Sequence, residues 1–370
     1  MTRSQPPVSL DEERHYWVAF SNFPGIGPQR FKLLVDYFGS AKRAWMAPFI
    51  DFQKLGLSEK IVLDFCDFRE KFFPYDYFSS LQKKGIKALS LLDKDYPELL
   101  KQISAPPPVL YFKGEFKPED NLSLAVVGTR KVTTYGREVT MVLVNNLVAA
   151  GLTIVSGLAR GVDTIAHQTA LSAGGRTIAV LGSGVENIYP PENKELAFRI
   201  SQKGAVVSEF PPDCPPVPQN FPIRNRIISG LSLGVLVTEA ASESGSLITA
   251  SDAAEHGREV FAVPGPITSP MSVGTAQLIQ KGAKLVHTVK DVLEELNLKQ
   301  RASQFTAKQI IAENPQEEKI LEILKNGPAH IDELIRRSEL QASQVGSLLG
   351  LAEIKGKIKN LGGGQYSLAS

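Results

Sequence analysis

Apolar positions in the middle of the chain form short continuous runs, each followed by a glycine-containing loop and a helical segment. Runs of this kind are LSLAVVG (122–128), LTIVSG (152–157), RTIAVLG (176–182), AVVSE (205–209), LGVLVTE (233–239) and EVFAVPG (259–265). Strands that are apolar on both faces are typical of a parallel sheet covered by helices on each side. The alternation of strand, loop and helix therefore predicts a doubly wound α/β domain.

The pattern before this domain has a helical period from residue 10 to about residue 100, as in Phe31, Leu34 and Phe38. The sequence FPGIGPQRF (23–31) then predicts a tight turn between two helices, the helix-hairpin-helix pattern that often binds a DNA backbone. A turn that only packs two helices together is an equally good interpretation. The prolines of APPPVLYFKG (105–114) break the helical pattern and favour an extended linker or an edge strand.

The last part of the chain predicts three helices and a two-stranded ribbon with a glycine-rich tip at IKNLGGGQYSL (358–368), which is a winged-helix plan. Residues 341–354 contain no Lys or Arg, whereas a helix that reads DNA normally needs cations. We therefore expect a structural role or protein contacts here rather than DNA binding. The predicted domains are a helical domain (10–104), the α/β core (105–296), a polar linker (297–316) and a winged-helix-like domain (317–370).

Composition is ordinary for a globular protein of 370 residues, and the 41 Lys and Arg nearly balance the 39 Asp and Glu. This balance excludes a histone-like basic coat but leaves room for a local basic site. Cys66 and Cys214 are far apart and belong to no C-x-x-C pair, so a disulfide scaffold or a zinc ribbon is not expected. The sequence contains neither a signal-peptide pattern nor an apolar run long enough to span a bilayer, so we expect a cytoplasmic protein without membrane contact.

Loops that follow the predicted strands carry glycine, hydroxyl and arginine side chains. In a parallel sheet these loops meet at the carboxyl edge, where α/β proteins bind anions on backbone amides and helix N-termini. Arg130 adds a guanidinium suited to phosphate. The sequence therefore predicts one anion-binding crevice, with phosphate-binding loops at Gly128, Thr129, Ser156, Gly157, Gly161, Ser244, Gly245 and Ser246.

A proline-rich loop is predicted to carry Phe221, Arg224, Asn225 and Arg226. Arginines beside an aromatic ring suit a single-stranded nucleic acid, because the arginine can bind a phosphate while the ring stacks on a base. Phe221 could instead only anchor the loop.

Several familiar catalytic patterns are absent. The sequence has no G-x-x-x-x-G-K-[ST] motif, no G-x-G-x-x-G after the first strand and no G-x-S-x-G elbow. Asp163 and His167 are four residues apart on a predicted helix, but we expect Asp163 to cap that helix and His167 to lie in the core. No catalytic residue, metal ligand or cofactor is predicted.

These motifs together resemble the DNA-processing protein A (DprA/Smf) family. The resemblance spans about residues 105–290 and rests on VVGTR, SGLARGVDTIAHQTAL, GGRTIAVLGSGVENIYPPEN, FPIRNRIISGLS and EAASESGSLITASDAAEHGREVFAVPG. It implies an extended Rossmann-like core, flanked by an N-terminal SAM-like module and a C-terminal winged-helix-like domain. It also implies a homodimer that binds single-stranded DNA, protects incoming DNA during natural transformation, helps to load RecA and can displace single-strand-binding protein.

The family's DNA-binding positions fall on Arg130, Arg176, Phe221, Arg224, Asn225 and Arg226. Arg176 opens a predicted strand, which would put it away from the crevice. Two other functions remain open. One is a nucleoside-monophosphate hydrolase of the lysine-decarboxylase-like class, although its P-G-G-x-G-T-x-x-E signature is missing and the comparable loop begins at Ser244. The other is a nucleotide-sensing scaffold that holds a small phosphate ligand.

Overall fold

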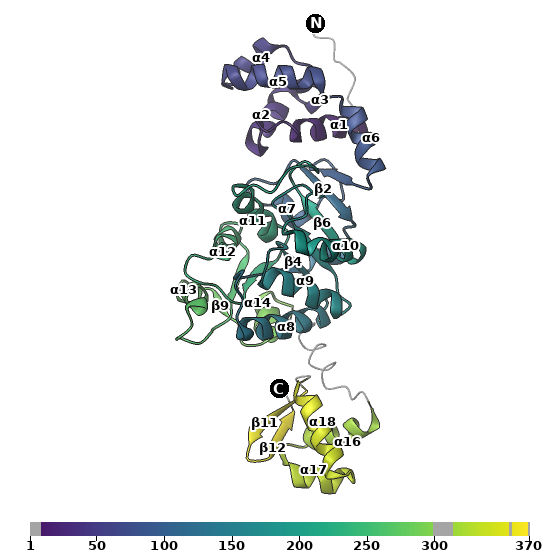
Figure 1. Cartoon of the computed structure of the whole chain (residues 1–370), viewed down its shortest axis with the longest axis vertical. Coiled ribbons are helices and arrows are strands. Elements are labelled where there is room, and N and C mark those ends of the chain that lie inside the picture. Colours follow the sequence, from purple (N-terminus) through teal and green to yellow (C-terminus); the bar gives the residue numbers. More distant parts are fainter. Residues whose placement is uncertain (1–8, 299–313, 355–356, 369–370) are drawn as a thin grey trace. The chain divides into compact units, whose positions relative to one another are not determined.

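The computed structural model describes residues 9–298, 314–354 and 357–368. The chain divides into two compact units, Met1–Val292 and Leu293–Ser370, which are drawn in Figure 1. The linker predicted over 297–316 falls largely outside the described residues. Among the described residues, no helix is both long enough and apolar enough to cross a bilayer.

The first unit begins with helices packed around aromatic side chains. Their bounds are α1 Leu10–Ser21, α2 Pro28–Phe38, α3 Ala41–Met46, α4 Phe49–Gln53, α5 Glu59–Lys71 and α6 Pro74–Lys83. Ser9 starts α1 by accepting a hydrogen bond from the Glu12 amide at 3.2 Å. Phe20 and Phe65 stack with their centroids 5.1 Å apart in the centre of this cluster. The helical pattern predicted from residue 10 is confirmed as far as Lys83.

A nine-stranded sheet forms the rest of the first unit. Its strands are β1 Lys87–Ser90, β2 Val109–Gly114, β3 Ser123–Val127, β4 Thr153–Ser156, β5 Thr177–Val180, β6 Ala205–Ser208, β7 Gly234–Val237, β8 Glu259–Ala262 and β9 Lys284–Leu285. All six strands predicted between residues 122 and 265 are present. Their order in the sheet is β1-β2-β6-β5-β4-β3-β7-β8-β9. All neighbouring strands along the stretch β6-β5-β4-β3-β7-β8-β9 are parallel to each other. Strands β1 and β2 add two antiparallel strands at one edge.

Two expectations about residues 87–114 are wrong. Lys87–Ser90 is a strand rather than a helix, and β2 pairs on both sides, with β1 and with β6, so it is not an edge strand. The prolines at 106–108 precede β2 and therefore remove no hydrogen-bond donor from it. The sheet thus begins at Lys87, whereas the predicted α/β core begins at residue 105.

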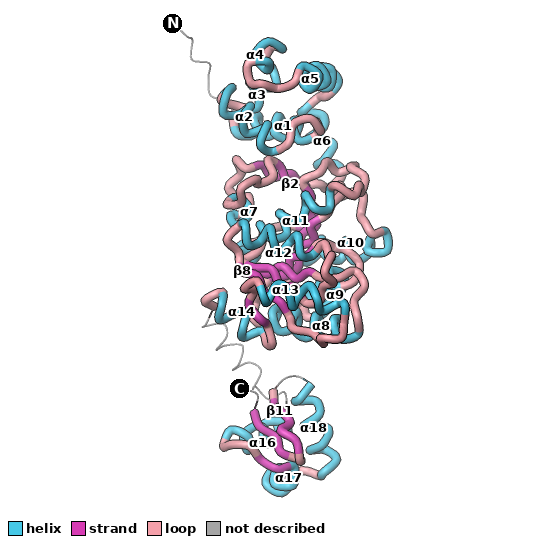
Figure 2. Tube along the Cα trace, turned by 90° about the vertical axis from the view of Figure 1, so that its left-hand side faces the viewer, coloured by secondary structure: helices cyan, strands magenta, loops and turns pink. Residues whose placement is uncertain are grey.

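Helices cover both faces of the sheet (Figure 2). They are α7 Glu98–Lys101, α8 Thr134–Ala149, α9 Val162–Ser172, α10 Lys194–Lys203, α11 Asn220–Gly230, α12 Ser246–Glu255, α13 Val273–Gln280 and α14 Val289–Glu295. Successive residues of β5 face opposite sides, as strand geometry requires. Ala179 packs among apolar side chains that include those of α10, whereas Ile178 and Val180 pack among apolar side chains of α11 and α12.

The sheet has a topological switch point at β3. From β3 the chain proceeds outwards through β4, β5 and β6 on one side, and through β7, β8 and β9 on the other. The loops after β3 and β7 therefore diverge at the carboxyl edge and leave a crevice between them, the usual ligand position in an open α/β sheet.

The second unit has the winged-helix plan predicted for it. Its elements are α16 Pro315–Lys325, β10 Ala329–His330, α17 Ile331–Ser338, α18 Ala342–Ile354, β11 Ile358–Gly362 and β12 Gln365–Leu368. Strand β12 pairs with both β10 and β11. Lys357 lies next to the first ribbon strand, but its ammonium is buried against the Glu317 carboxylate at 2.8 Å. This cation is thus used within the domain.

Candidate nucleic-acid interface

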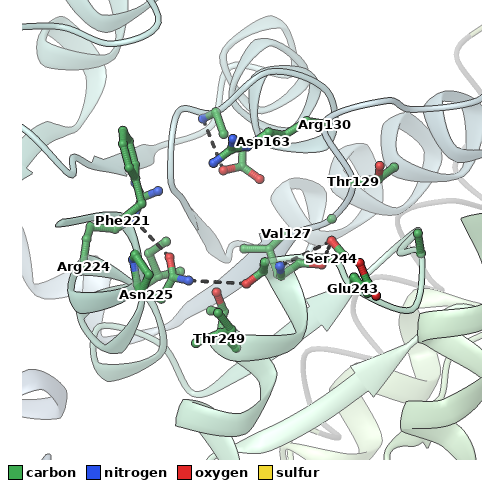
Figure 3. A pocket seen from close by; sticks show the side chains of 18 of the residues that line it. Val127, Thr129, Arg130, Asp163, Phe221, Arg224, Asn225, Glu243, Ser244 and Thr249 are labelled. Atoms are coloured by element: carbon green, nitrogen blue, oxygen red, sulfur yellow. Dashed lines mark hydrogen bonds between the residues drawn. The ribbon is translucent and has the colours of Figure 1, made fainter. Parts of the chain in front are cut away.

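A crevice of about 670 Å³ opens at the switch point. Its walls come from the loop after β3, the loop after β7, the start of α12 and the first turns of α11. Figure 3 shows Thr129 and Arg130, then Phe221, Arg224 and Asn225, then Glu243 and Ser244 arranged around it. The predicted convergence of separate loops on one crevice is present in the structure.

The loop after β3 presents an exposed cation over a close-packed turn. A Cβ on Gly128 would lie 2.7 Å from both the Glu239 carbonyl oxygen and Val162 Cγ2, so only glycine fits this approach. The Thr129 amide donates to the same Glu239 carbonyl at 2.7 Å. The Arg130 side chain is exposed and lines the crevice. The turn is therefore fixed by backbone contacts, while the guanidinium of Arg130 stays accessible.

The Phe221 ring lies close to two arginines. Its ring centroid is 5.9 Å from Arg130 Cζ and 6.0 Å from Arg224 Cζ. The loop predicted here is wrong, because Asn220–Gly230 is helix α11. Pro222 falls in the first turn of that helix, where its missing amide hydrogen costs no intrahelical bond. Helix α11 supplies the ring and Arg224, and the loop after β3 supplies Arg130, a combination that can stack a base and bind its phosphate.

Arg224 is only 4% exposed and is held by main-chain acceptors. Its Nη1 donates to the Gly157 carbonyl at 2.6 Å and to the Val180 carbonyl. Burial lowers the pKa of Arg224 to about 10, with Arg130 acting in the same direction and Asp163 opposing it. The group still carries its charge at neutral pH, so it gives the crevice wall a fixed positive charge.

Asp163 is a buried carboxylate beside this arginine. It accepts hydrogen bonds from the amides of Gly157 at 3.1 Å and Ala159 at 3.3 Å. Burial raises its pKa to about 6, against the lowering effect of Arg224. The expected cap is not the arrangement found, because the carboxylate binds amides that precede α9 and thereby fixes the loop. The Gly157 amide, predicted to face an anion, is thus bonded to Asp163.

His167 lies in the core behind this loop. It is 0% exposed, its Nδ1 is 2.7 Å from Thr177 Oγ1, and burial lowers its pKa to about 3. Across the part of the chain that the structure describes, no group of three or more His, Cys, Asp or Glu side chains could hold a metal ion.

The other predicted phosphate loops are also largely bonded within the protein. Ser156 is buried, and its hydroxyl donates to the Val126 carbonyl at 2.6 Å. Gly161 has φ +77° and lies against the backbone of the loop after β3. In the loop after β7, the hydroxyls of Ser244 and Ser246 are 2.8 Å apart, and Gly245 accepts a hydrogen bond from Asn225 at 3.4 Å. The exposed side-chain cations Arg130 and Lys131 are therefore the groups best placed to meet an anion.

Two predicted DNA-binding arginines lie outside the crevice lining. Arg176, just before β5, pairs with Asp120 at 2.8 Å and donates to the Lys203 and Glu115 carbonyls at 3.1 and 3.0 Å. Arg226 lies two residues beyond Arg224 on α11, which turns it away from the crevice, and it pairs with the largely buried Glu209 at 2.6 Å. Each of these arginines is thus paired with a carboxylate inside the fold.

The crevice also contains residues that the sequence did not single out as contacts. Lys131 is exposed directly after Arg130 and lines the same wall. Tyr189, which follows β5, has its ring centroid 5.7 Å from that of Phe221. The adjacent basic residues in Thr-Arg-Lys could have indicated Lys131, but the position of Tyr189 depends on a contact between the loop after β5 and helix α11.

The turn between α1 and α2 uses its nearest cation internally. Gly27 is the N-cap of α2, and Arg30 Nη1 donates to the Gly25 carbonyl at 2.8 Å. In the turn for which a helix-hairpin-helix pattern is predicted, Arg30 therefore makes a contact within the turn itself. Lys32 remains exposed on α2.

Comparison with known proteins supports one family. Residues 87–297 match the family model described as DNA recombination-mediator protein A, and residues 306–364 match the DprA winged helix domain. Protein Smf of Synechocystis is 34% identical over 393 residues, covering 96% of this chain and 99% of that protein. The DNA processing protein DprA of Bacillus subtilis is 43% identical over 230 residues, covering 61% of this chain and 77% of its own. The chain therefore belongs to the DNA-processing protein A (DprA/Smf) family.

Solved structures of two DprA proteins have the same fold. The protein from Streptococcus pneumoniae gives a TM-score of 0.68 at 36% identity, covering 76% of this chain and 97% of that one. The protein from Helicobacter pylori gives a TM-score of 0.52 at 31% identity, covering 58% of this chain and 96% of that one. The latter structure is described as showing the single-stranded DNA binding mode of that protein.

Proposed function

We propose that this protein binds single-stranded DNA in the crevice and acts as a recombination mediator. The observation that carries the proposal is the proximity of Phe221 to both Arg130 and Arg224 at the crevice. A ring of this kind accepts any base, and the cations bind the backbone, so binding does not require sequence readout. Membership of the family and the description of the Helicobacter pylori structure support the same ligand.

The cellular role that we propose comes from the family resemblance. The protein protects incoming DNA during natural transformation, helps to load RecA onto the strand and displaces single-strand-binding protein. It acts as a homodimer in the cytoplasm and catalyses no reaction. RecA loading is tested by measuring RecA-dependent strand exchange on DNA coated with single-strand-binding protein, with and without this chain.

The binding proposal is tested by fluorescence anisotropy with a labelled homopolymeric single strand of about 20 nucleotides and with its duplex. We expect preferential binding to the single strand, weakened by added salt because phosphate contacts release counterions. Absence of binding at low salt would show the proposal to be wrong. Incubation with nucleoside monophosphates tests the non-catalytic assignment, since release of free base would contradict it.

A further inference from the structure

Tyr189 gives the crevice a second aromatic surface next to Phe221. Its side chain lines the crevice and is 37% exposed. The two ring centroids are 5.7 Å apart, and the ring planes are inclined at 54°. A base inserted between two rings needs parallel faces separated by about 7 Å, twice the ordinary carbon–carbon contact distance. The two rings therefore cannot share one base, so a base stacked on Tyr189 would be a different one from a base stacked on Phe221.

An exposed arginine accompanies each ring. Arg130 Cζ lies 5.9 Å from the Phe221 centroid, and Arg160 Cζ lies 6.0 Å from the Tyr189 centroid. The combination of aromatic ring and arginine thus occurs twice, although Arg160 lies beside Tyr189 and is not itself part of the crevice lining. Arg160 is already paired with Glu192, through Nε at 2.5 Å and Nη2 at 3.2 Å. A phosphate at this position would have to compete with that carboxylate.

The segment that carries Tyr189 is held on both sides. Before it, Asn187 Nδ2 donates to the carbonyls of Asp213 at 2.5 Å and Cys214 at 3.3 Å. After it, Asn193 Nδ2 donates to the Leu158 carbonyl at 2.9 Å and to Thr164 Oγ1 at 2.8 Å. An exposed ring on a fixed segment loses little freedom when a ligand stacks on it.

We propose that Tyr189 and Arg160 form a second nucleotide subsite, so that the crevice holds at least two consecutive nucleotides of one strand. This inference rests on the proposed function. Phe221 takes one base and Tyr189 the next, with the connecting backbone running from Arg130 in the crevice lining to Arg160 beside Tyr189. Glu192 weakens the second subsite by neutralising Arg160.

The experiment measures anisotropy of a labelled thymidine 20-mer with the full chain and with Tyr189→Leu, Tyr189→Phe and Phe221→Leu. We expect Tyr189→Leu to weaken binding about 5- to 100-fold, the range for loss of one base–aromatic stack. Tyr189→Phe keeps the ring and should bind like wild type. If Tyr189→Leu binds like wild type while Phe221→Leu loses affinity, the second subsite is wrong and the proposed function stands. If wild type does not bind at all, both proposals are wrong.

Charge variants test the same subsite without changing the ring. Glu192→Gln should raise affinity about two- to fivefold, the size of an exposed ion pair, because Arg160 becomes available to phosphate. In the background of Arg160→Ala the same substitution should have no effect. An equal gain in both backgrounds would overturn the role of Arg160, since it would reflect general loss of negative charge. Both positions are exposed, so folding should be unaffected and is checked by thermal unfolding.

Discussion

The Arg224 guanidinium lies against the backbone of Gly157, whose carbonyl accepts a hydrogen bond from Nη1 at 2.6 Å. A Cβ on Gly157 would be 2.7 Å from Nη1 and 2.8 Å from Cζ of the same side chain. The glycine in this loop thus makes room for a cation rather than for a ligand. Its amide serves Asp163, so both polar groups of Gly157 position charges in the crevice wall.

Gly157→Ala should therefore weaken DNA binding through displacement of Arg224. We expect a loss of about 1–3 kcal/mol in the free energy of unfolding, as for overpacking of a dense site, together with reduced affinity for single-stranded DNA. Gly346→Ala on α18, where a Cβ meets nothing within 4 Å, is the matched control. Chemical denaturation and anisotropy measure the two effects. Unchanged DNA affinity in Gly157→Ala would contradict the role given to Arg224.

Arg130 and Arg176 should behave differently when each is replaced by alanine. Arg130→Ala removes an exposed cation, so we expect weaker binding and a salt slope reduced in magnitude by about 0.7, the value for one phosphate on a single strand. Arg176→Ala leaves Asp120 buried without its partner, which should lower stability by about 3 kcal/mol and leave the salt slope unchanged. Titrations at several salt concentrations separate the two, and equal slopes for both variants would refute the assignment.

Arg226 is expected to act mainly in stability. Arg226→Ala leaves the buried Glu209 carboxylate unpaired, which should cost about 3–5 kcal/mol in the free energy of unfolding. Replacing both partners, with Arg226→Met and Glu209→Gln, should recover much of that loss because no buried charge remains. DNA affinity of the folded double variant should match wild type. A large loss of affinity in that variant would restore Arg226 to the DNA-binding set.

Asp163 should give the protein a distinct pH dependence. Its pKa in the folded protein is about 6, above the ordinary value of 3.8, so the folded state holds this proton more tightly than the unfolded state. The resulting stabilisation is complete below about pH 4 and is lost as pH rises through about 6. Protonation also removes a negative charge beside Arg224, so DNA should bind more tightly at pH 5.5 than at pH 7.5.

The control for this pH effect is Asp163→Asn, which cannot ionise. Its stability should lack the contribution that declines between about pH 4 and pH 6, and the part of the DNA affinity that depends on Asp163 should disappear. Urea unfolding and anisotropy across this range make both comparisons. A wild-type pH profile that survives in Asp163→Asn would assign the effect to another group.

The sequence predicts the sheet well because its strands are continuous apolar runs that can pack only between two helical layers. It fails at Lys87–Ser90, a short edge strand with little apolar character, whose place depends on pairing with β2. The sequence-based prediction also fails at α11. The prolines before and inside its first turn favour a loop, and only the structure shows that Pro222 occupies a first-turn position, which a helix tolerates.

The site is only partly predictable for a related reason. Loops that end parallel strands converge by topology, so Arg130 and Ser244 could be placed at one edge without any knowledge of side-chain contacts. Ion pairing between Arg226 and Glu209 depends on how α11 faces β6 and its following loop. The contact between Tyr189 and Phe221 likewise arises only when the loop after β5 folds against helix α11.

The measurement that tests the central claim most directly is the affinity of Phe221→Leu for a labelled single strand of about 20 nucleotides, compared with wild type. Phe221 is half-buried at the crevice wall, and leucine keeps its apolar character without an aromatic face. We predict a 5- to 100-fold weaker complex, the range for loss of one stacked base, with thermal unfolding close to wild type. Equal affinity in the two proteins would show that single-stranded DNA does not bind across Phe221 in this crevice.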